Sequence, residues 1–476
     1  MIQTLKILWR FEAISMFRNS FQMLLFASIL LLGLYAIYYG NAIIQVQRQT
    51  IEAVGEIERD EFNEYRRSFE MTPSSTKEEQ VLQIASDPAY AWHRHGYHAI
   101  LPPHAYAALA LGQRDVEPYY YKLTGMSLYY QLFEGELANP LKLYAGNFDL
   151  SFVLIYLFPL LVIAFTYGLY AEEKENGVLP LLNIQPIGLN KIILVRFGFY
   201  FLLITGLGIL LSLIGFMVSG IGLDGLAAVL WSATLLCYLG FWFALMYALV
   251  ALKRNSSLTA ISAAALWLFF LIVFPAVLNS YATASHPVDS TVLTEITRRK
   301  SLENEEDLEE AKTVVLEYLE TQKVYQGADS LLDQNTLAKA YAAFTALNDA
   351  HYREEVTEYQ EQIRLREAWI SNFRWINPAV NAQGVFNEVV ETDLGTFQSF
   401  HRSIENFHRN ITHFYFSRLF FGHAIAAGDY GDLPTFELSV DRGTRMNNIM
   451  KRLLELFLGV ILIMGAGLLL FNRKLT

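Results

Sequence analysis

The sequence contains a single cysteine among its 476 residues and few charged side chains. Because Cys237 is alone, no disulfide can form within the chain, and cysteine usage does not report the redox compartment. Charged residues make up 17% of the chain, whereas about a quarter is typical of soluble domains. Together with a hydrophobic fraction of 53% and a mean hydropathy of +0.26, this shortage of charge indicates an integral membrane protein.

Several motifs of catalysis and nucleotide binding are also missing. No Gly-x-x-x-x-Gly-Lys-Ser/Thr segment is present to hold a nucleotide phosphate, and nothing resembles Gly-x-Ser-x-Gly or His-Glu-x-x-His. We therefore expect a chain that is not an enzyme and that holds no catalytic residue and no cofactor. The net charge of −11 also argues against a nucleic acid partner, because nucleic acid phosphates require a basic surface.

The apolar residues gather into six runs, each long enough to cross about 30 Å of hydrocarbon as a helix. The runs are Phe21–Tyr39, Leu150–Tyr170, Ile192–Val218, Leu226–Leu252, Leu258–Leu278 and Leu453–Phe471. The first run is too long for a cleaved signal peptide, and no cleavage pattern follows it. Charge within the runs is nearly absent, which disfavours an ion-coupled transporter. The sequence predicts an all-α membrane protein with six transmembrane helices in the lipid bilayer.

Residues 1–20 precede the first run and carry apolar side chains at helical spacing beside Lys6, Arg10 and Arg18. This pattern favours an amphipathic helix at the membrane interface. A plain cytoplasmic extension of the first span is an equally good interpretation of the residues. With the first span, this segment forms the first predicted unit, 1–39.

Basic residues in the short loops collect on one side, which the positive-inside rule assigns to the cytoplasm. They are Lys6, Arg10, Arg18, Lys174, Lys191, Arg196, Lys253, Arg254, Arg473 and Lys474. Lys451 and Arg452, at the other end of the last span, run against this rule. They equal Arg473 and Lys474 in number and therefore do not reverse the predicted orientation. Both termini are therefore predicted to be cytoplasmic.

This orientation places two long insertions outside the membrane, 40–149 and 279–450, while 150–278 holds four spans and 451–476 the last one. The second insertion has 26 acidic and 15 basic residues, a deficit equal to that of the whole chain. Gln45–Phe69 is predicted to continue the first span as a helix. Residues 295–372 are predicted to form two or three long helices broken near Gly327 and Asn335. Neither insertion has enough apolar residues for a core of its own, so we expect one mainly helical extracytoplasmic domain built from both.

The sharpest functional signal lies between the second and third spans, in residues 171–191. Glu172, Glu173 and Glu175 stand where a helix dipole prefers cations, which suggests a basic partner or a solvated surface. Asn176-Gly177 is suited to a left-handed turn, and Asn190 to the cap of the next helix. Exposed leucines on such a loop favour a groove in another protein, although a loop packed on its own spans is the alternative. The candidate docking residues are Glu172, Glu173, Glu175, Gly177, Leu179, Leu181, Leu182 and Pro186.

Residues 175–188, Glu-Asn-Gly-Val-Leu-Pro-Leu-Leu-Asn-Ile-Gln-Pro-Ile-Gly, resemble the loop after the second span of ABC-2 type permeases, usually Glu-x-Gly-Thr-Leu-x-x-Leu-x-x-Gln-Pro-Val-Ser. Residues 101–122, Leu-Pro-Pro-His-Ala-Tyr-Ala-Ala-Leu-Ala-Leu-Gly-Gln-Arg-Asp-Val-Glu-Pro-Tyr-Tyr-Tyr-Lys, are similar to the hallmark of a bacterial subgroup with large extracytoplasmic insertions after the first span and before the last. Ile376-Asn-Pro-Ala-Val and Phe407-His-Arg fall where that subgroup has Ser-Pro-Ala and Phe-His-Arg segments. Val178, Gly188 and Asn377 depart from the usual residues.

The resemblance implies the permease subunit of an ATP-binding cassette transporter in the bacterial cytoplasmic (inner) membrane. A separate ATPase subunit would dock on the 171–191 loop and bind ATP and Mg²⁺, and a second permease, identical or related, would complete the transporter. The implied function is export of a hydrophobic or amphipathic substrate. A second hypothesis is mechanical transmission from the ATPase to an envelope protein partner, with nothing transported.

All ten histidines fall in the two insertions, and His93, His95 and His98 lie close together in the sequence. Imidazole clusters bind zinc or copper, and a third hypothesis is delivery of metal or sulfur species to an extracytoplasmic enzyme. However, His-x-His-x-x-His is not a strong zinc spacing, and no cysteine accompanies it. We therefore predict no metal site and keep these three histidines as weak candidates.

Overall fold

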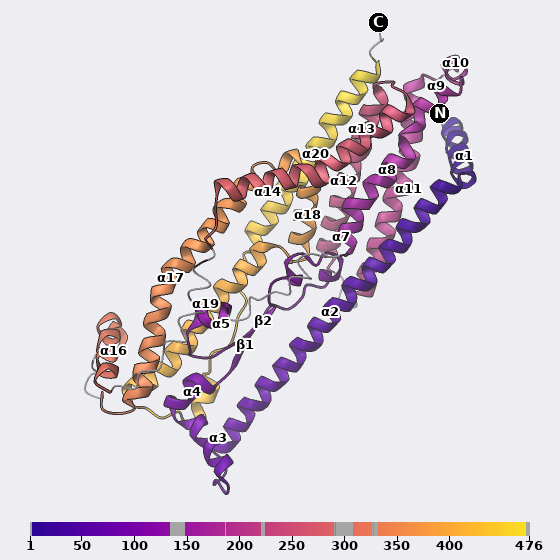
Figure 1. Cartoon of the computed structure of the whole chain (residues 1–476). Helices are drawn as coiled ribbons and strands as arrows, with labels where there is room; N and C mark the ends of the chain where they lie inside the picture. The colour runs from indigo at the N-terminus through magenta and orange to yellow at the C-terminus, as the bar shows by residue number, and fades with distance from the viewer. Residues whose placement is uncertain are drawn as a thin grey trace.

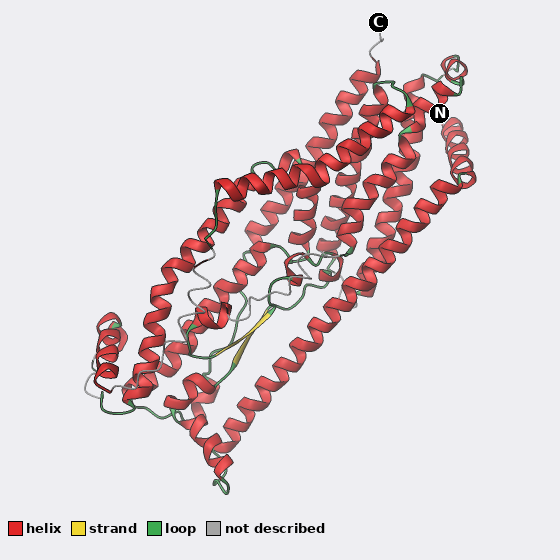
Figure 2. Ribbon diagram, in the orientation of Figure 1, coloured by secondary structure: helices red, strands yellow, loops and turns green. Residues whose placement is uncertain are grey.

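The computed structural model describes residues 2–133, 148–185, 187–219, 224–289, 291, 308–325, 327 and 332–472. Apart from one two-stranded sheet, the secondary structure of these residues is helical (Figure 2). The elements of the first half are α1 (Ile2–Arg18), α2 (Ser20–Ser68), α3 (Thr76–Ser86), α4 (Pro88–Arg94), β1 (Tyr97–Ile100), η1 (Ala107–Leu109), η2 (Gly112–Asp115), β2 (Tyr120–Leu123), α5 (Leu128–Phe133), α7 (Leu150–Phe152), η3 (Val153–Leu157), α8 (Phe158–Thr166), α9 (Gly168–Glu175), α10 (Leu179–Asn183) and α11 (Leu189–Val218). Those of the second half are α12 (Gly225–Ala251), α13 (Ser256–Leu268), η4 (Phe269–Val273), α14 (Phe274–Ser285), α16 (Leu308–Thr321), η6 (Lys323–Tyr325), α17 (Thr336–Ser371), η8 (Arg374–Ile376), α18 (Pro378–Val389), α19 (Leu394–Phe421), η9 (Ala427–Gly431) and α20 (Arg442–Asn472).

In the described part of the chain, six helical stretches are long and apolar enough to cross a membrane. They are Ser20–Ser68, Leu150–Glu175, Leu189–Val218, Gly225–Ala251, Ser256–Ser285 and Arg442–Asn472. Each contains one of the six predicted runs to within a residue or two, so the prediction of a helical protein with six such segments is confirmed. This architecture supports a multi-pass membrane protein.

The start of α1, the end of α20 and α10 lie together at one end of the elongated molecule, which we call the loop end (Figure 1). The opposite end is the distal domain, built around a second hydrophobic cluster from residues 62–133, 308–356 and 397–438. Both predicted insertions contribute to this cluster. For example, Trp92 packs on Phe416 with ring centroids 5.7 Å apart, and Asp349 accepts a hydrogen bond of 2.9 Å from the Leu128 backbone N–H.

Helix α2 connects the loop end to the tip of the distal domain without a break (Figure 1). Its 49 residues span roughly 70 Å at the helical rise, of which a membrane would take about 30 Å. The predicted helical continuation over Gln45–Phe69 is confirmed to within a residue. At Gly40 an added Cβ would lie 2.0 Å from the Ala108 carbonyl oxygen, so η1 packs directly on the helix backbone.

Residues 295–372 agree with their predicted helices where the structure describes them. Helices α16 and α17 are separated before Thr336, and Asn335 takes a left-handed conformation with φ of 52°. Residues 292–307 and 328–331 lie outside the described residues. The antiparallel pair β1–β2, in which Tyr97 faces Leu123, is an element that the sequence did not predict.

Two helical stretches contain a π-helical turn directly before a Phe-Pro pair, at η3 and η4. Proline has no backbone N–H, and its ring clashes with the preceding helical turn. A π-helical turn accommodates both the missing hydrogen bond and the clash. Side chains of other helices bind the carbonyl oxygens left free. Tyr238 donates to Ile155 O at 2.7 Å, Trp267 to Tyr156 O at 3.0 Å, and Asn377 to Phe270 O at 2.6 Å. Such bonds are required where no water can reach the backbone.

Helix α18 lies apart from the distal domain, although it belongs to the second insertion. Ala379, Ala382, Val385 and Phe386 are buried in the same hydrophobic cluster as the six apolar helices. The Phe386 ring lies 4.2 Å from that of Trp231 in α12. One piece of the predicted outer insertion therefore packs among the spans.

Candidate functional site

The segment between the second and third spans forms a short helical turn at the loop end. Helix α9 ends at Glu175, Gly177 follows with φ of 72°, and α10 begins at Leu179. The predicted left-handed turn at Asn176-Gly177 is confirmed, and it is closed by the Val178 N–H, which donates to Glu173 O at 2.9 Å. A Cβ at position 177 would meet no atom within 4 Å, so the backbone conformation is what requires glycine here.

The apolar residues of this turn divide into a packed and an exposed set. Leu179 packs on the main hydrophobic cluster and Leu182 is half-buried, whereas Leu181 and Ile184 leave 60% and 78% of their surface exposed. Ile184 was missed among the candidate docking residues, although it follows Leu181 by three positions and shares its face. The candidate Pro186 lies outside the described residues.

The three acidic candidates differ in their partners. Glu173 accepts from Arg196 Nη1 at 2.9 Å, and Glu175 accepts from the Ser256 N–H at 2.8 Å at the start of α13. Glu172 is exposed. Glu173 and Glu175 thus hold the turn to neighbouring helices, and Glu175 is exposed to solvent as Glu172 is.

Arg196 also joins the turn to the first helix of the chain. Its Nε donates to Glu12 in α1, and the Tyr200 hydroxyl donates to the other Glu12 oxygen at 2.7 Å. Trp9 adds a hydrogen bond of 3.2 Å from its ring N–H to Val195 O. Glu12 is only 1% exposed, so its carboxylate needs a compensating charge. Among the described basic groups, Arg196 is the one that forms an ion pair with it. Helix α1, helix α11 and the turn are therefore connected through one guanidinium group.

Helix α1 has the amphipathic character that one of the two interpretations predicted. Ile7, Phe11, Ile14 and Phe17 are exposed on one side, whereas Glu12 and Met16 face α11. Asn19 caps α2 by accepting from the Phe21 N–H at 3.1 Å, which makes α1 a separate helix. The first span and the segment before it are therefore not one continuous helix.

The predicted capping role of Asn190 is also wrong, because Gly188 is the N-cap of α11. The Asn190 side chain instead accepts from the Tyr247 hydroxyl and donates to Asn472 Oδ1 at 3.3 Å. These contacts tie the start of α11 to α12 and to the end of α20, since Phe471 also stacks on Tyr247.

The histidines His93, His95 and His98 have separate surroundings. His95 is fully buried and its Nδ1 lies 2.6 Å from the Tyr415 hydroxyl, while His98 Nδ1 lies 2.8 Å from Glu58. His93 packs beside the Trp92 ring. Among the described residues, no group of three or more His, Cys, Asp or Glu side chains is arranged for a metal ion.

Residues 101–122 form a collar around α2 where it leaves the main cluster. Arg114 is buried and donates to Gln47 Oε1 at 3.0 Å and to Leu101 O at 2.8 Å. Burial lowers the pKa of Arg114 to about 10. The Leu111 N–H donates to Asp149 at 2.8 Å, and the Gln113 N–H to Thr392 O at 2.8 Å. The collar thus joins α2, α7 and the second insertion.

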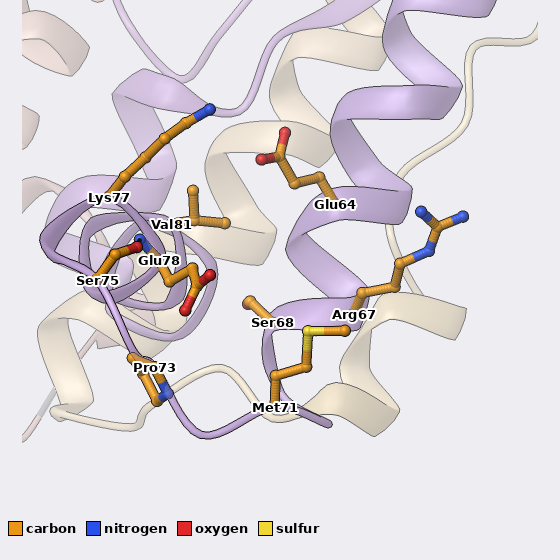
Figure 3. A pocket seen from close by; sticks show the side chains of 9 residues that line it. All are labelled: Glu64, Arg67, Ser68, Met71, Pro73, Ser75, Lys77, Glu78 and Val81. Carbon is orange, nitrogen blue, oxygen red and sulfur yellow. Dashed lines mark hydrogen bonds between the residues drawn. The ribbon is translucent and has the colours of Figure 1, made fainter.

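A shallow pocket of about 290 Å³ lies at the tip of the distal domain, between the end of α2 and the start of α3 (Figure 3). Glu64 and Arg67 come from α2, and Lys77 and Val81 from α3. The exposed Met71 lies in the connection between the two helices.

Comparison with known proteins gives one match. A family model described as "Domain of unknown function (DUF3526)" matches residues 294–439, a range that includes α17, α18 and α19. No curated protein and no solved structure matches the chain. The fold therefore places the chain in a broad class, helical multi-pass membrane proteins. More specifically, it contains a region similar to DUF3526.

Proposed function

We propose that this chain is the permease subunit of an ATP-driven exporter of the ABC-2 type in the bacterial inner membrane. The observation that carries the proposal is the α9–α10 turn, which exposes Leu181 and Ile184 at the loop end, away from the distal domain. An ATPase subunit would dock on this turn and supply ATP and Mg²⁺. A second permease would complete the transporter, and the substrate would be hydrophobic or amphipathic.

The contacts of the turn make it suited to transmit movement. Glu173 binds Arg196 and Glu175 binds Ser256, and these two contacts hold the turn to neighbouring helices. The exposed residues of the turn follow them by only a few positions in the sequence. A partner that pushes on Leu181 would therefore move α11 and α13 together, and α1 through Glu12. Exposed apolar side chains on a rigid turn also favour burial in another protein over continued contact with water.

Co-purification with an ABC ATPase subunit that is co-expressed with this chain tests the proposal. We expect the ATPase to co-purify with the wild type and to be lost, by at least tenfold, from the double variant Leu181→Asp, Ile184→Asp. Met71→Asp is the matched control, because it places the same charge on an exposed apolar residue of the distal domain. Undiminished ATPase in the double variant would contradict docking on the turn.

A second function, mechanical transmission to an envelope protein, is supported by α2. This helix is continuous from the loop end to the tip pocket, so a movement at one end displaces the other (Figure 1, Figure 3). Gly55→Pro would break α2 between the collar and the tip, because proline removes a helical hydrogen bond at a cost of about 3 kcal/mol. Export that survives Gly55→Pro favours the transporter. Loss of an envelope phenotype with ATPase activity intact favours transmission.

A further inference from the structure

A cleft of about 380 Å³ lies where α17, α18, α19 and α20 meet, along the half-buried face of α18 that carries Val380, Gln383 and Asn387. Its charged lining residues are three arginines and three acids, Arg364, Arg374, Arg452, Glu367, Glu388 and Asp393. The Ser371 hydroxyl and the amides of Gln113, Gln383, Asn387, Gln398 and Asn448 complete the polar wall. A lining with equal numbers of opposite charges suits a ligand that itself carries both signs.

The central ion pair of the cleft, Glu388 with Arg452, is incompletely satisfied. Arg452 Nη2 lies 3.1 Å from Glu388 Oε1, but Glu388 Oε2 and Arg452 Nε are buried without a hydrogen-bond partner among the described residues. Glu388 is only 7% exposed. A buried carboxylate oxygen without a hydrogen-bond partner destabilises the protein, so binding of a donor at this oxygen would be favourable.

The backbone of α18 holds this pair in place. A Cβ at Gly384 would lie 1.6 Å from Arg452 Nη1, so the guanidinium group lies directly on the helix. A second pair, Arg374 with Glu455, has an N–O distance of 3.3 Å and receives Asn381 Nδ2 on the same carboxylate at 3.2 Å. Both arginines are thus fixed at the wall of the cleft by acids from neighbouring helices.

Aromatic residues place the cleft at a membrane interface. Trp369 and Trp375 lie among the lining residues Glu367, Ile370 and Arg374 in the sequence. Trp369 also stacks on Tyr281 of α14, with ring centroids 5.2 Å apart. Tryptophan and tyrosine gather at the level of lipid headgroups. The apolar run of α20 begins at residue 453, directly after Arg452. The cleft therefore lies at headgroup depth, on the side of the bilayer that faces the distal domain.

We propose that this cleft binds the headgroup of a phosphatidylethanolamine-type lipid, with its ammonium group at Glu388 and its phosphate at the arginines. A primary ammonium brings three N–H donors, one of which would satisfy Glu388 Oε2. A phosphate accepts charge-assisted hydrogen bonds from guanidinium groups. This inference does not rest on the proposed export function.

The electrostatics of Glu388 agree with an additional cation. Burial raises the pKa of Glu388 to about 7, although Arg452 and Arg374 lower it. The arginines therefore do not fully compensate the buried carboxylate, and a bound ammonium would favour its ionised form. A choline headgroup has no N–H donor, and a glycerol headgroup has no positive charge, so both should bind more weakly.

Native mass spectrometry of the full-length chain from nanodiscs of equal parts phosphatidylethanolamine, phosphatidylcholine and phosphatidylglycerol tests the proposal. We expect the wild type to retain phosphatidylethanolamine at least tenfold over the other two lipids, and Glu388→Gln to lose this preference. Glu391→Gln is the matched control, because its ion pair with Arg445 lies outside the cleft. Equal retention of the three lipids by the wild type, or an unchanged preference in Glu388→Gln, would overturn the proposal.

A second variant guards against misfolding of Glu388→Gln, which leaves Arg452 without its acid. Asn448 is exposed and lines the cleft, so Asn448→Trp should block the cleft and abolish the preference without touching the ion pair. Soluble phosphoethanolamine distinguishes a lipid from a free zwitterion. Binding of the soluble compound as tight as that of the lipid would overturn the assignment to a lipid.

Discussion

Glu12 and Arg196 form an ion pair across 184 positions of the sequence, and this pair attaches α1 to α11. The same arginine binds Glu173, next to the exposed α9–α10 turn. The separate helix α1 and the proposed docking turn thus share one cation. Any movement that separates the turn from α11 must also rearrange the contacts of α1.

Removing either member of this pair should detach α1. Glu12 is almost fully buried, and breaking a buried pair by removing one partner costs about 3–5 kcal/mol. We expect Arg196→Ala to be cleaved faster than the wild type by trypsin within α1, where Lys6, Arg10 and Arg18 are exposed. Limited proteolysis followed by mass spectrometry measures the rate.

The double variant Glu12→Gln, Arg196→Met is the informative control, because it leaves no buried charge uncompensated. It should be cleaved more slowly than Arg196→Ala. If all variants are cleaved at the wild-type rate, the pair does not hold α1.

Gly40 and Gly55 lie in the same helix and should respond oppositely to alanine. At Gly40 the added Cβ would meet the Ala108 carbonyl oxygen at 2.0 Å, whereas at Gly55 it would meet no atom within 4 Å. Gly40→Ala should destabilise the protein by about 1–3 kcal/mol through overpacking. Gly55→Ala should stabilise it by roughly 0.5–1 kcal/mol, because alanine loses less backbone entropy in a helix. Thermal unfolding in detergent compares the two, and a similar shift for both would contradict the close contact between α2 and the collar.

His95 should make the distal domain sensitive to acid. Burial lowers the pKa of His95 from 6.5 to about 4, and the ring lies against Phe62, Tyr65 and Tyr415. The unfolded chain therefore binds a proton at higher pH than the folded one. The stability from neutral His95 is complete above pH 6.5 and decreases as the pH falls towards 4, by up to about 3 kcal/mol.

Hydrogen exchange of the distal domain at pH 7 and pH 5 measures this loss. His95→Gln should reduce the difference in hydrogen-exchange protection between pH 7 and pH 5, because glutamine does not titrate. His413→Gln, an exposed histidine on the same helix as Tyr415, should leave the difference unchanged. An unaltered pH dependence in His95→Gln would show that other groups control it.

The elements that follow from local pattern were predictable, and those that depend on distant contacts were not. The six apolar stretches, the helical continuation after Gln45 and the turn at Gly177 follow from composition, length and turn residues. Glu12 gave a weak signal, because it is the one acidic residue in a helix whose other charged residues are basic. Its partner could not be chosen, because nothing in the sequence brings α1 beside Arg196.

Helix α18 shows most clearly what could not be predicted from the sequence. Its sequence mixes apolar residues with three amides, Asn381, Gln383 and Asn387, a composition equally suited to an outer domain and to a polar-lined position among spans. The position of α18 among the spans is shown only by two contacts in the structure. The Phe386 ring packs on Trp231, and the Asn377 side chain donates a hydrogen bond to the π-helical turn of η4. Prolines in apolar runs signal such turns, but the side chain that satisfies the freed carbonyl comes from another part of the chain.

Asn377 has two roles that a substitution can separate. Its Oδ1 caps α18 by accepting from the Ala379 N–H at 2.9 Å, and its Nδ2 donates to Phe270 O at 2.6 Å. Asn377→Ser keeps a capping oxygen but leaves Phe270 O without a donor in a buried position, which should cost about 1–3 kcal/mol. Asn255 caps α13 in the same way but is exposed, so Asn255→Ser should change stability by less than about 0.5 kcal/mol. Thermal unfolding of the two variants in detergent gives the comparison. Equal shifts would mean that the capping oxygen alone accounts for Asn377 and that α18 does not hold η4 in place.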